Sequence, residues 1–285
     1  MSNNIKLIEC PRDAMQGLHD FIPTATKAAY INQLLKVGFD TIDFGSFVSP
    51  KAIPQLRDTA EVLNLLDLST TKSKLLAIIA NTRGAEDACK FEEIDYLGFP
   101  FSISETFQQR NTNSSIQESI QRVDEIQNLC VKHNKKLVIY ISMAFGNPYG
   151  DAWNGEIAVN YTEKLYQKGI RIFAMSDTIG SSNKENITDL FSKVIPAFAD
   201  AEIGAHLHST PETRLEKIAA TYEAGCRRFD AAIHGIGGCP MAKEELTGNL
   251  ATESLIDYFD SLKVDIKLNR TALNEAYNHA SVVFG

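Results

Sequence analysis

Long hydrophobic runs are absent from this sequence of 285 residues, in which no apolar stretch approaches the ~18 residues that a membrane-spanning helix needs. The first residues, MSNNIKLIECPRD, contain neither an apolar signal core nor an arginine-rich amphipathic stretch. Positive charge is also scarce, since 28 Lys and Arg stand against 36 Asp and Glu and the net charge is −8. Nucleic-acid binding needs an electropositive surface, so we expect neither a nucleic acid nor a membrane as partner.

Paired cysteines are missing as well. The five cysteines are odd in number, scattered along the chain and without a CxxC motif. This pattern is typical of reduced thiols in the cytosol rather than of a disulfide scaffold. With 44% hydrophobic and 22% charged residues, the composition also excludes disorder and collagen-like repeats. We therefore expect a soluble cytoplasmic protein with a sizeable core.

No glycine- or serine-rich linker and no low-complexity tract divides the chain. Short β-rich runs instead alternate with longer runs of helical periodicity along its whole length. Eight strands are predicted, at residues 5–10, 41–46, 74–80, 94–99, 136–144, 171–177, 202–209 and 228–234. Helical runs follow them at about residues 24–37, 58–67, 83–91, 115–133, 154–168, 184–198, 212–224 and 248–262, with a ninth at 270–283.

Three segments share the same local order of elements. LLKVGFDTIDF, LYQKGIRIFAM and TYEAGCRRFDA each pass from a helical run through a glycine into a strand. Gly38, Gly169 and Gly225 thus hold the position where a left-handed residue closes a helix. The recurrence indicates a repeated βα unit. Eight such units in 285 residues match a closed (β/α)₈ TIM barrel with a parallel sheet.

The main alternative fold is a doubly wound open sheet, which usually carries a glycine-rich phosphate loop after its first strand. Here Cys10 is followed by PRDAMQG instead. We therefore predict a single-domain α/β protein over residues 1–285, with a TIM barrel at about 5–262 and a C-terminal helical extension at about 263–285. In such a barrel the active site lies at the carboxyl ends of the strands.

The strongest sign of chemistry is the pair His206 and His208, at the end of strand seven in the run EIGAHLHST. Side chains alternate along a strand, so both imidazoles point to one side and Leu207 points to the other. Two imidazoles on one face at a barrel mouth can share one cation. Taken alone, an HxH motif is more often explained by one histidine in the core and one in solvent, and the barrel context is what favours the shared cation.

Strand one ends in ECPRD, which supplies Glu9, Arg12 and Asp13. A carboxylate there can lie across the barrel mouth from the two histidines and complete a mixed oxygen and nitrogen set, which suits Mg²⁺ or Mn²⁺ and does not exclude Zn²⁺. An arginine beside it offers fixed donors to a developing oxyanion. The plain alternative is a surface Arg–Asp ion pair.

Other candidate residues follow the remaining strands. Asp43 in TIDFGS and Asp177 in AMSDTIG are each expected either to orient a histidine or to cap and pack. The run GIGGCP surrounds Cys239 with three glycines, which predicts a mobile lid that carries a thiol, although a free cysteine in a turn is the simpler interpretation. Asn249 can cap the helix that follows or offer its amide oxygen to a cation.

Together these motifs resemble the hydroxymethylglutaryl-CoA lyase family. The matching runs, in order over nearly the whole chain, are PRDAMQG, SFVSPKAIPQ, SDTIG, HLH and GIGGCPMA with TGNLATE. The resemblance implies a metal-dependent TIM barrel that cleaves 3-hydroxy-3-methylglutaryl-CoA to acetoacetate and acetyl-CoA, with Mg²⁺ or Mn²⁺, in leucine degradation or ketone-body formation. It also implies a small-molecule acyl-CoA as substrate and a homodimer.

The resemblance also assigns roles by position. It implies that the metal ligands are Asp13, His206, His208 and Asn249 and that the catalytic residues are Arg12, Asp13, His206 and Cys239. In this interpretation Arg12 donates to the thioester oxygen. Asp13 or a metal-bound water takes the hydroxyl proton, and His206 or Cys239 returns a proton to carbon.

The chain departs from the family's pattern at several places. Ala14 follows PRD where the family has glycine, Asp43 replaces a glutamate, and the HxHD pattern ends in Ser209. Val138 stands nearest to the position of an expected strand-five arginine. These departures bear on the acyl-CoA substrate more than on the metal or the reaction type.

Two other functions fit the same scaffold. A Claisen-type synthase or aldolase of the wider metallolyase group usually carries an added C-terminal domain, whereas only residues 263–285 follow the eighth helical run. A barrel that binds metal but has lost catalysis would fit the altered Val138 and Ser209 positions. A turnover assay separates the lyase from such a binding protein.

Overall fold

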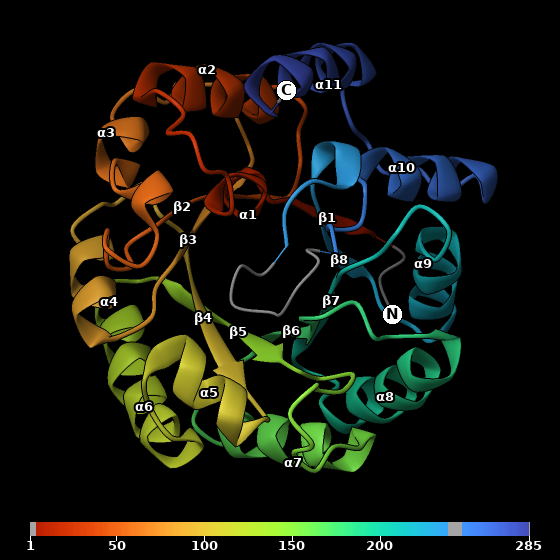
Figure 1. Cartoon of the computed structure of the whole chain (residues 1–285). Coiled ribbons are helices and arrows are strands. Elements are labelled where there is room, and N and C mark those ends of the chain that lie inside the picture. The colour runs from red at the N-terminus through yellow and green to blue at the C-terminus, as the bar shows by residue number, and fades with distance from the viewer. Residues whose placement is uncertain (1–3, 239–246, 285) are drawn as a thin grey trace.

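In the computed structural model, which describes residues 4–238 and 247–284, eight parallel strands form a closed barrel. Each strand pairs with the next along the chain, and β8 returns to pair with β1. Figure 1 shows the strands in the middle of the molecule and the helices around them. The strands are β1 Lys6–Glu9, β2 Thr41–Ser46, β3 Lys74–Ile78, β4 Tyr96–Ser102, β5 Lys136–Ser142, β6 Ile172–Asp177, β7 Glu202–Leu207 and β8 Arg228–Ala231. The predicted TIM barrel is confirmed.

The helices that match the predicted runs are α2 Thr24–Leu35, α3 Thr59–Leu63, α4 Thr82–Ala88, α6 Ile116–Lys132, α7 Gly155–Tyr166, α8 Lys184–Ala197, α9 Arg214–Glu223, α10 Thr252–Ser261 and α11 Arg270–Phe284. The sequence patterns do not predict α1 Pro11–Gln16, α5 Glu105–Thr112 or the 3₁₀ turns η1 Pro54–Leu56 and η2 Ile233–Gly235. Short elements such as these are difficult to predict, because an apolar stripe at helical spacing needs more residues than they have.

Local signals set several helix ends. The Ser115 hydroxyl accepts a hydrogen bond from the Glu118 N–H, and the Glu118 carboxylate accepts one from the Ser115 N–H, which is a capping box at the start of α6. Gly38, Gly169 and Gly225 have φ angles of 89°, 89° and 99°. They therefore close α2, α7 and α9 in the left-handed conformation that the sequence predicts.

Strand β4 runs three residues further than the prediction of 94–99, and it contains Pro100. A proline cannot donate to a strand ladder. The pairing of β3 with β4 ends at Ile78 and Gly98, whereas β4 continues to pair with β5 as far as Ser102. Pro100 therefore lies beyond the residues of β4 that pair with β3, so its lack of an N–H removes no hydrogen bond from that ladder.

Two apolar clusters make up the core. The larger cluster lies between the strands and the outer helices. Side chains alternate along each strand, and those that point to the inside of the barrel form the smaller cluster. The smaller cluster consists of Leu76, Val138, Tyr140, Ile172 and Ala174. The barrel interior is thus apolar on the side of β3, β5 and β6. Charged residues line the opposite side at β7 and β8, as described below.

The predicted C-terminal helix is confirmed as α11, which Figure 1 shows beside α2. The Tyr30 ring of α2 meets the rings of His279 and Phe284 edge to face, with centroid distances of 5.7 and 5.5 Å. These contacts hold α11 on the outside of the barrel. In the described ranges, no helix combines the length and the apolar character needed to cross a bilayer.

Candidate metal centre and active site

The structure brings Asp13, His206 and His208 together at the barrel mouth. One ligand atom from each lies within 4.8 Å of the others, and all three side chains are buried. Pro11 opens α1 directly after β1, which places Asp13 on a helical turn over the mouth. His206 and His208 follow the alternation of β7, while Leu207 packs into the outer core.

The hydrogen bonds of the two histidines leave one nitrogen of each ring available. His208 Nδ1 lies 2.7 Å from the Thr247 carbonyl oxygen. A carbonyl oxygen only accepts, so Nδ1 carries the hydrogen and Nε2 keeps its lone pair. His206 Nδ1 faces the Asp230 carboxylate at 3.3 Å in the same way. Burial and the neighbouring His206 lower the pKa of His208, which favours the neutral ring that a metal ligand requires.

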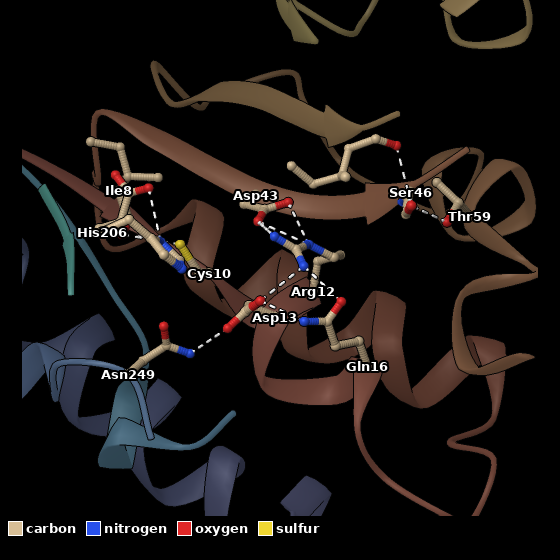
Figure 2. Close-up of polar contacts among 12 residues, drawn as sticks. Ile8, Cys10, Arg12, Asp13, Gln16, Asp43, Ser46, Thr59, His206 and Asn249 are labelled. Atoms are coloured by element: carbon tan, nitrogen blue, oxygen red, sulfur yellow. Dashed lines mark hydrogen bonds and ion pairs between the residues drawn. The ribbon is translucent and has the colours of Figure 1, made fainter. Parts of the chain in front are cut away.

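Asp13 is surrounded by donors. Its Oδ1 accepts from Arg12 Nη1 at 2.9 Å and from Gln16 Nε2 at 2.7 Å, and its Oδ2 accepts from Asn249 Nδ2 at 2.7 Å (Figure 2). Burial alone would raise the pKa of Asp13, but Arg12 and the two histidines hold it below its usual value. Asp13 is therefore an anion at neutral pH, as a ligand to a divalent cation must be.

Asn249 belongs to this group through its side-chain amide. Its Nδ2 donates to Asp13 and also to the Ile236 carbonyl at 2.9 Å, which leaves the amide oxygen as an acceptor. The alternative in which Asn249 caps the next helix is wrong, because α10 begins at Thr252 with Ala251 at its N-cap.

The glycine-rich segment after β8 comes close to this site. Gly237 has a φ of 108°, and a Cβ atom there would lie 2.6 Å from Asn249 Nδ2 and 2.9 Å from the Asp13 carbonyl oxygen. A glycine is therefore required at 237 for both the backbone conformation and the close approach. Cys239, the predicted lid thiol, lies outside the described residues.

Arg12 lies between two carboxylates, as Figure 2 shows. Its Nε donates to Asp43 Oδ2 at 3.0 Å, its Nη2 to the same oxygen at 2.5 Å, and its Nη1 to Asp13 and Gln16. A guanidinium has five N–H groups, and these bonds use the one at Nε, both at Nη1 and one of the two at Nη2. One N–H of Nη2 is therefore left to donate elsewhere. Burial raises the pKa of Asp43 to about 6 although Arg12 opposes this.

Asp43 and Asp177, expected either to orient a histidine or to cap and pack, both contact cations. Asp43 pairs with Arg12, and Asp177 Oδ2 accepts from Lys217 Nζ at 2.9 Å. Lys217 also donates to the His208 carbonyl oxygen at 2.7 Å, so Asp177 is linked to the backbone of His208 rather than to its ring. Among the described residues both carboxylates form buried ion pairs and neither hydrogen-bonds a histidine ring, so the structure favours the packing alternative over the histidine-orienting one.

The prediction left open whether Glu9 or Asp13 faces the histidines, and the structure selects Asp13. Glu9 alternates to the outer side of β1, where its Oε1 accepts from the Ile233 N–H at 2.9 Å and its Oε2 from the Thr252 hydroxyl at 2.6 Å. Glu9 is only 1% exposed to solvent. Burial raises the pKa of Glu9 to about 8, although the two donors act against it.

This pKa makes the stability of the protein depend on pH. The folded state binds the Glu9 proton more tightly than the unfolded chain, whose pKa is near 4.5, so the free energy of unfolding should fall as pH rises from about 4.5 to about 8. We expect Glu9→Gln to remove roughly 2–4 kcal/mol of this dependence. Chemical unfolding at pH 5, 6.5 and 8 tests it, with the exposed Glu61→Gln as control. Parallel pH profiles for wild type and Glu9→Gln would contradict the assignment.

A second cluster in the described residues shares His206. Cys10 Sγ, Asp230 and His206 also have ligand atoms within 4.8 Å of one another. This group is a poor metal site, because Arg228 already pairs with Asp230 and because burial raises the pKa of the Cys10 thiol well above its usual value. Cys10, Asp230 and Arg228 are not among the residues predicted for the site, although the alternation of R-F-D in β8 places Arg228 and Asp230 on the same face of the strand.

The first cluster fits a divalent cation better. Carboxylate oxygen and imidazole nitrogen bind such ions at about 2.0–2.3 Å, so ligand atoms within 4.8 Å of one another can reach one ion. An anionic carboxylate beside two imidazoles, each of which must be neutral to bind a metal, is compatible with Mn²⁺, Mg²⁺ and Zn²⁺. Asn249 lies beside this cluster with its Nδ2 on Asp13, and the resemblance implies that its amide oxygen, a donor suited to the harder ions, is a further ligand.

This cluster lies at the end of a cavity of about 520 Å³. The volume is in the range of small-molecule binding sites. Arg12, Asp13, His206 and His208 line the polar end. The cavity extends toward the segment after β2 and toward α5, where its walls include Val48, Ser49, Ala52, Ile53, Phe107, Arg110, Asn111, Thr112 and Asn113. The unpredicted α5 therefore forms one wall of the site.

A TIM barrel with a mixed carboxylate and imidazole cluster at its mouth defines a class of metal-dependent enzymes. The family model described as HMGL-like matches residues 4–279, and the chain belongs to this family, whose members are divalent-metal-dependent carbon–carbon lyases. The resemblance seen in the sequence motifs is thus confirmed.

Individual relatives agree with this assignment. The chain is 33% identical over 259 residues to hydroxymethylglutaryl-CoA lyase YngG of Bacillus subtilis, which covers 91% of this chain and 85% of that protein. It is 31% identical over 279 residues to the mitochondrial hydroxymethylglutaryl-CoA lyase of Homo sapiens, with 98% and 85% covered. An HMG-CoA lyase from Acinetobacter baumannii, solved with coenzyme A and 3-methylmalate, superposes with a TM-score of 0.92 at 29% identity, covering 100% of this chain and 93% of that one.

Proposed function

We propose that this protein is a divalent-metal-dependent lyase that cleaves 3-hydroxy-3-methylglutaryl-CoA, or a closely related acyl-CoA, to acetoacetate and acetyl-CoA. The observation that carries the proposal is the buried cluster of Asp13, His206 and His208 at the end of a cavity of about 520 Å³. The relatives named as HMG-CoA lyases support the substrate class.

The reaction breaks the bond between the carbinol carbon and the carbon next to the thioester. The hydroxyl proton must leave, and the departing carbon must keep the electron pair as an enolate until it is protonated. Asp13, His206, His208 and Asn249 would hold Mg²⁺ or Mn²⁺, which polarises the substrate hydroxyl and lowers its pKa when bound. Arg12 would donate its remaining N–H to the thioester oxygen as negative charge develops there.

The surroundings of Asp13 favour one of its two suggested roles. Three donors and a lowered pKa make its carboxylate a weak base and a good metal ligand. We therefore assign Asp13 to holding the cation, and the other acceptor named above, a water at the cation, would take the hydroxyl proton. Of the two proposed donors of the proton that returns to carbon, Cys239 is then the one we retain, because His206 would bind the cation through Nε2 while Asp230 holds its Nδ1 hydrogen.

We also propose where the enzyme works and what it binds. We place it in the cytoplasm as a single-domain homodimer that acts on a small acyl-CoA, with neither nucleic acid nor membrane as partner. A rat relative named 3-hydroxy-3-methylglutaryl-CoA lyase, cytoplasmic, is 28% identical over 273 residues and supports the compartment, whereas other relatives are named mitochondrial.

An acetyl-CoA release assay over a small panel of 3-hydroxyacyl-CoA esters tests the proposal. We expect 3-hydroxy-3-methylglutaryl-CoA to give one acetoacetate for each acetyl-CoA. A chelator should stop the reaction, and added Mg²⁺ or Mn²⁺ should restore it. Cleavage that continues in chelator contradicts the metal-dependent reaction, and metal binding without cleavage of any ester identifies a binding protein instead.

A further inference from the structure

Strand β8 carries two buried charges on its inner face, Arg228 and Asp230. The Arg228 side chain is 4% exposed and the Asp230 side chain is 0% exposed. They alternate with Phe229, which packs into the outer core. Burying an ion pair inside a barrel costs desolvation free energy, which further hydrogen bonds to the two charged groups must offset. Here those contacts lead toward the candidate metal centre.

The contacts form a continuous line through the interior. Arg228 Nε lies 3.1 Å from Glu202 Oε1 at the start of β7, and Arg228 Nη1 lies 2.9 Å from Asp230 Oδ1. The other oxygen of the same carboxylate, Asp230 Oδ2, lies 3.3 Å from His206 Nδ1. The guanidinium and the imidazole therefore hold opposite oxygens of one buried carboxylate.

Gly204 on β7 leaves the space that Arg228 occupies. A Cβ atom at 204 would lie 2.8 Å from Arg228 Nη1 and 2.9 Å from its Cδ. Gly204 stands two residues before His206, on the same face of the strand. The missing side chain at 204 thus lets the guanidinium reach the carboxylate that contacts His206.

We propose that Arg228 is a positioning residue for the metal centre. It fixes the Asp230 carboxylate, and Asp230 accepts the Nδ1 hydrogen of His206 and so keeps Nε2 directed at the cation. A carboxylate that bonds the far nitrogen of a ligating histidine sets the ring's tautomer and orientation, and its loss typically weakens metal binding about 10–100-fold. The proposal rests on the proposed function, because it assumes that His206 binds a metal.

The test measures metal binding to the intact protein rather than turnover alone. Titration of the metal-free protein with Mn²⁺ gives the dissociation constant, and Co²⁺ gives a visible spectrum that reports the ligand geometry. We expect Arg228→Met to raise the Mn²⁺ dissociation constant at least about 10-fold and to change the Co²⁺ bands. Arg228→Lys, which retains a cation, should restore part of the affinity.

Two further variants separate positioning from folding. Gly204→Ala keeps every charge but pushes the guanidinium away from Asp230, so it should weaken Mn²⁺ binding in the same direction as Arg228→Met. Arg227→Met is the matched control, because Arg227 faces outward over the Tyr222 ring. It should bind Mn²⁺ like the wild type. Circular dichroism and the melting temperature identify any variant that has not folded.

The outcomes distinguish this inference from the proposed function. Wild-type affinity and an unchanged Co²⁺ spectrum in a folded Arg228→Met or Gly204→Ala protein would overturn the role of Arg228. If the wild-type protein itself binds no Mn²⁺, the proposed function fails first. A lower melting temperature with unchanged metal binding would identify Arg228 as a structural residue only, and it too would overturn the inference.

Discussion

Replacement of Asp13 by alanine is expected to lower the turnover of 3-hydroxy-3-methylglutaryl-CoA by about 1000-fold or more, because a bound cation contributes several kcal/mol of transition-state stabilisation and each 1.36 kcal/mol is tenfold in rate. Asp13 supplies the only anionic group in the cluster with His206 and His208. Without it, two imidazoles and an amide must hold the ion. Steady-state kinetics over a range of Mn²⁺ concentrations measures the effect.

The comparison needs a control for charge and for folding. Asp20→Ala removes a carboxylate that is fully exposed beside the same segment, and its turnover should match the wild type. Asp13→Asn keeps the shape of the side chain and should lose metal affinity with little change in melting temperature. Near-normal turnover by a folded Asp13→Ala protein would remove Asp13 from the metal centre.

Replacement of Arg12 by methionine is expected to lower kcat about 100–1000-fold, the usual cost of removing one preorganised donor to a developing oxyanion. The change also leaves the buried Asp43 and Asp13 without their shared guanidinium. Arg12→Lys should rescue little, because an ammonium cannot bond both carboxylates in the planar geometry of a guanidinium. Kinetics at saturating Mn²⁺ separates loss of this donor from loss of metal.

The exposed Arg83→Met on α4 provides the matched control and should leave kcat unchanged. A second measurement fixes the interpretation of Arg12. Its loss should reduce kcat much more than it weakens Mn²⁺ binding. If the drop in activity disappears when Mn²⁺ is raised, Arg12 acts by supporting Asp13 and not by contacting the substrate.

The sequence predicts those features that depend on local periodicity. Eight strands, each followed by a helix, indicate the barrel because every unit repeats the same pattern. Side chains along β7 point to opposite faces in turn, which places His206 and His208 on the same face. The ends of parallel strands meet at one rim of a barrel, so a carboxylate after β1 and imidazoles on β7 could be expected to lie together. The structure shows that they do.

Features that depend on pairing between distant segments could not be predicted in the same way. Nothing local distinguishes Asp43, a carboxylate whose ion pair is with Arg12, from Asp230, a carboxylate that contacts a histidine ring as well as an arginine. The eight residues of α5 lack an apolar stripe, so their place in the cavity wall follows only from tertiary packing. Arg228 is similar, because the space it fills is left by a glycine on the neighbouring strand.

The metal centre depends on Asp13, His206 and His208 binding one divalent cation. Anomalous scattering from crystals soaked in Mn²⁺ tests it most directly, because the signal locates the ion without reference to activity. We expect a single strong peak within about 2.0–2.3 Å of a carboxylate oxygen of Asp13 and the Nε2 atoms of both histidines. A fully soaked crystal with no peak there, or with its strongest peak elsewhere in the barrel, would contradict it.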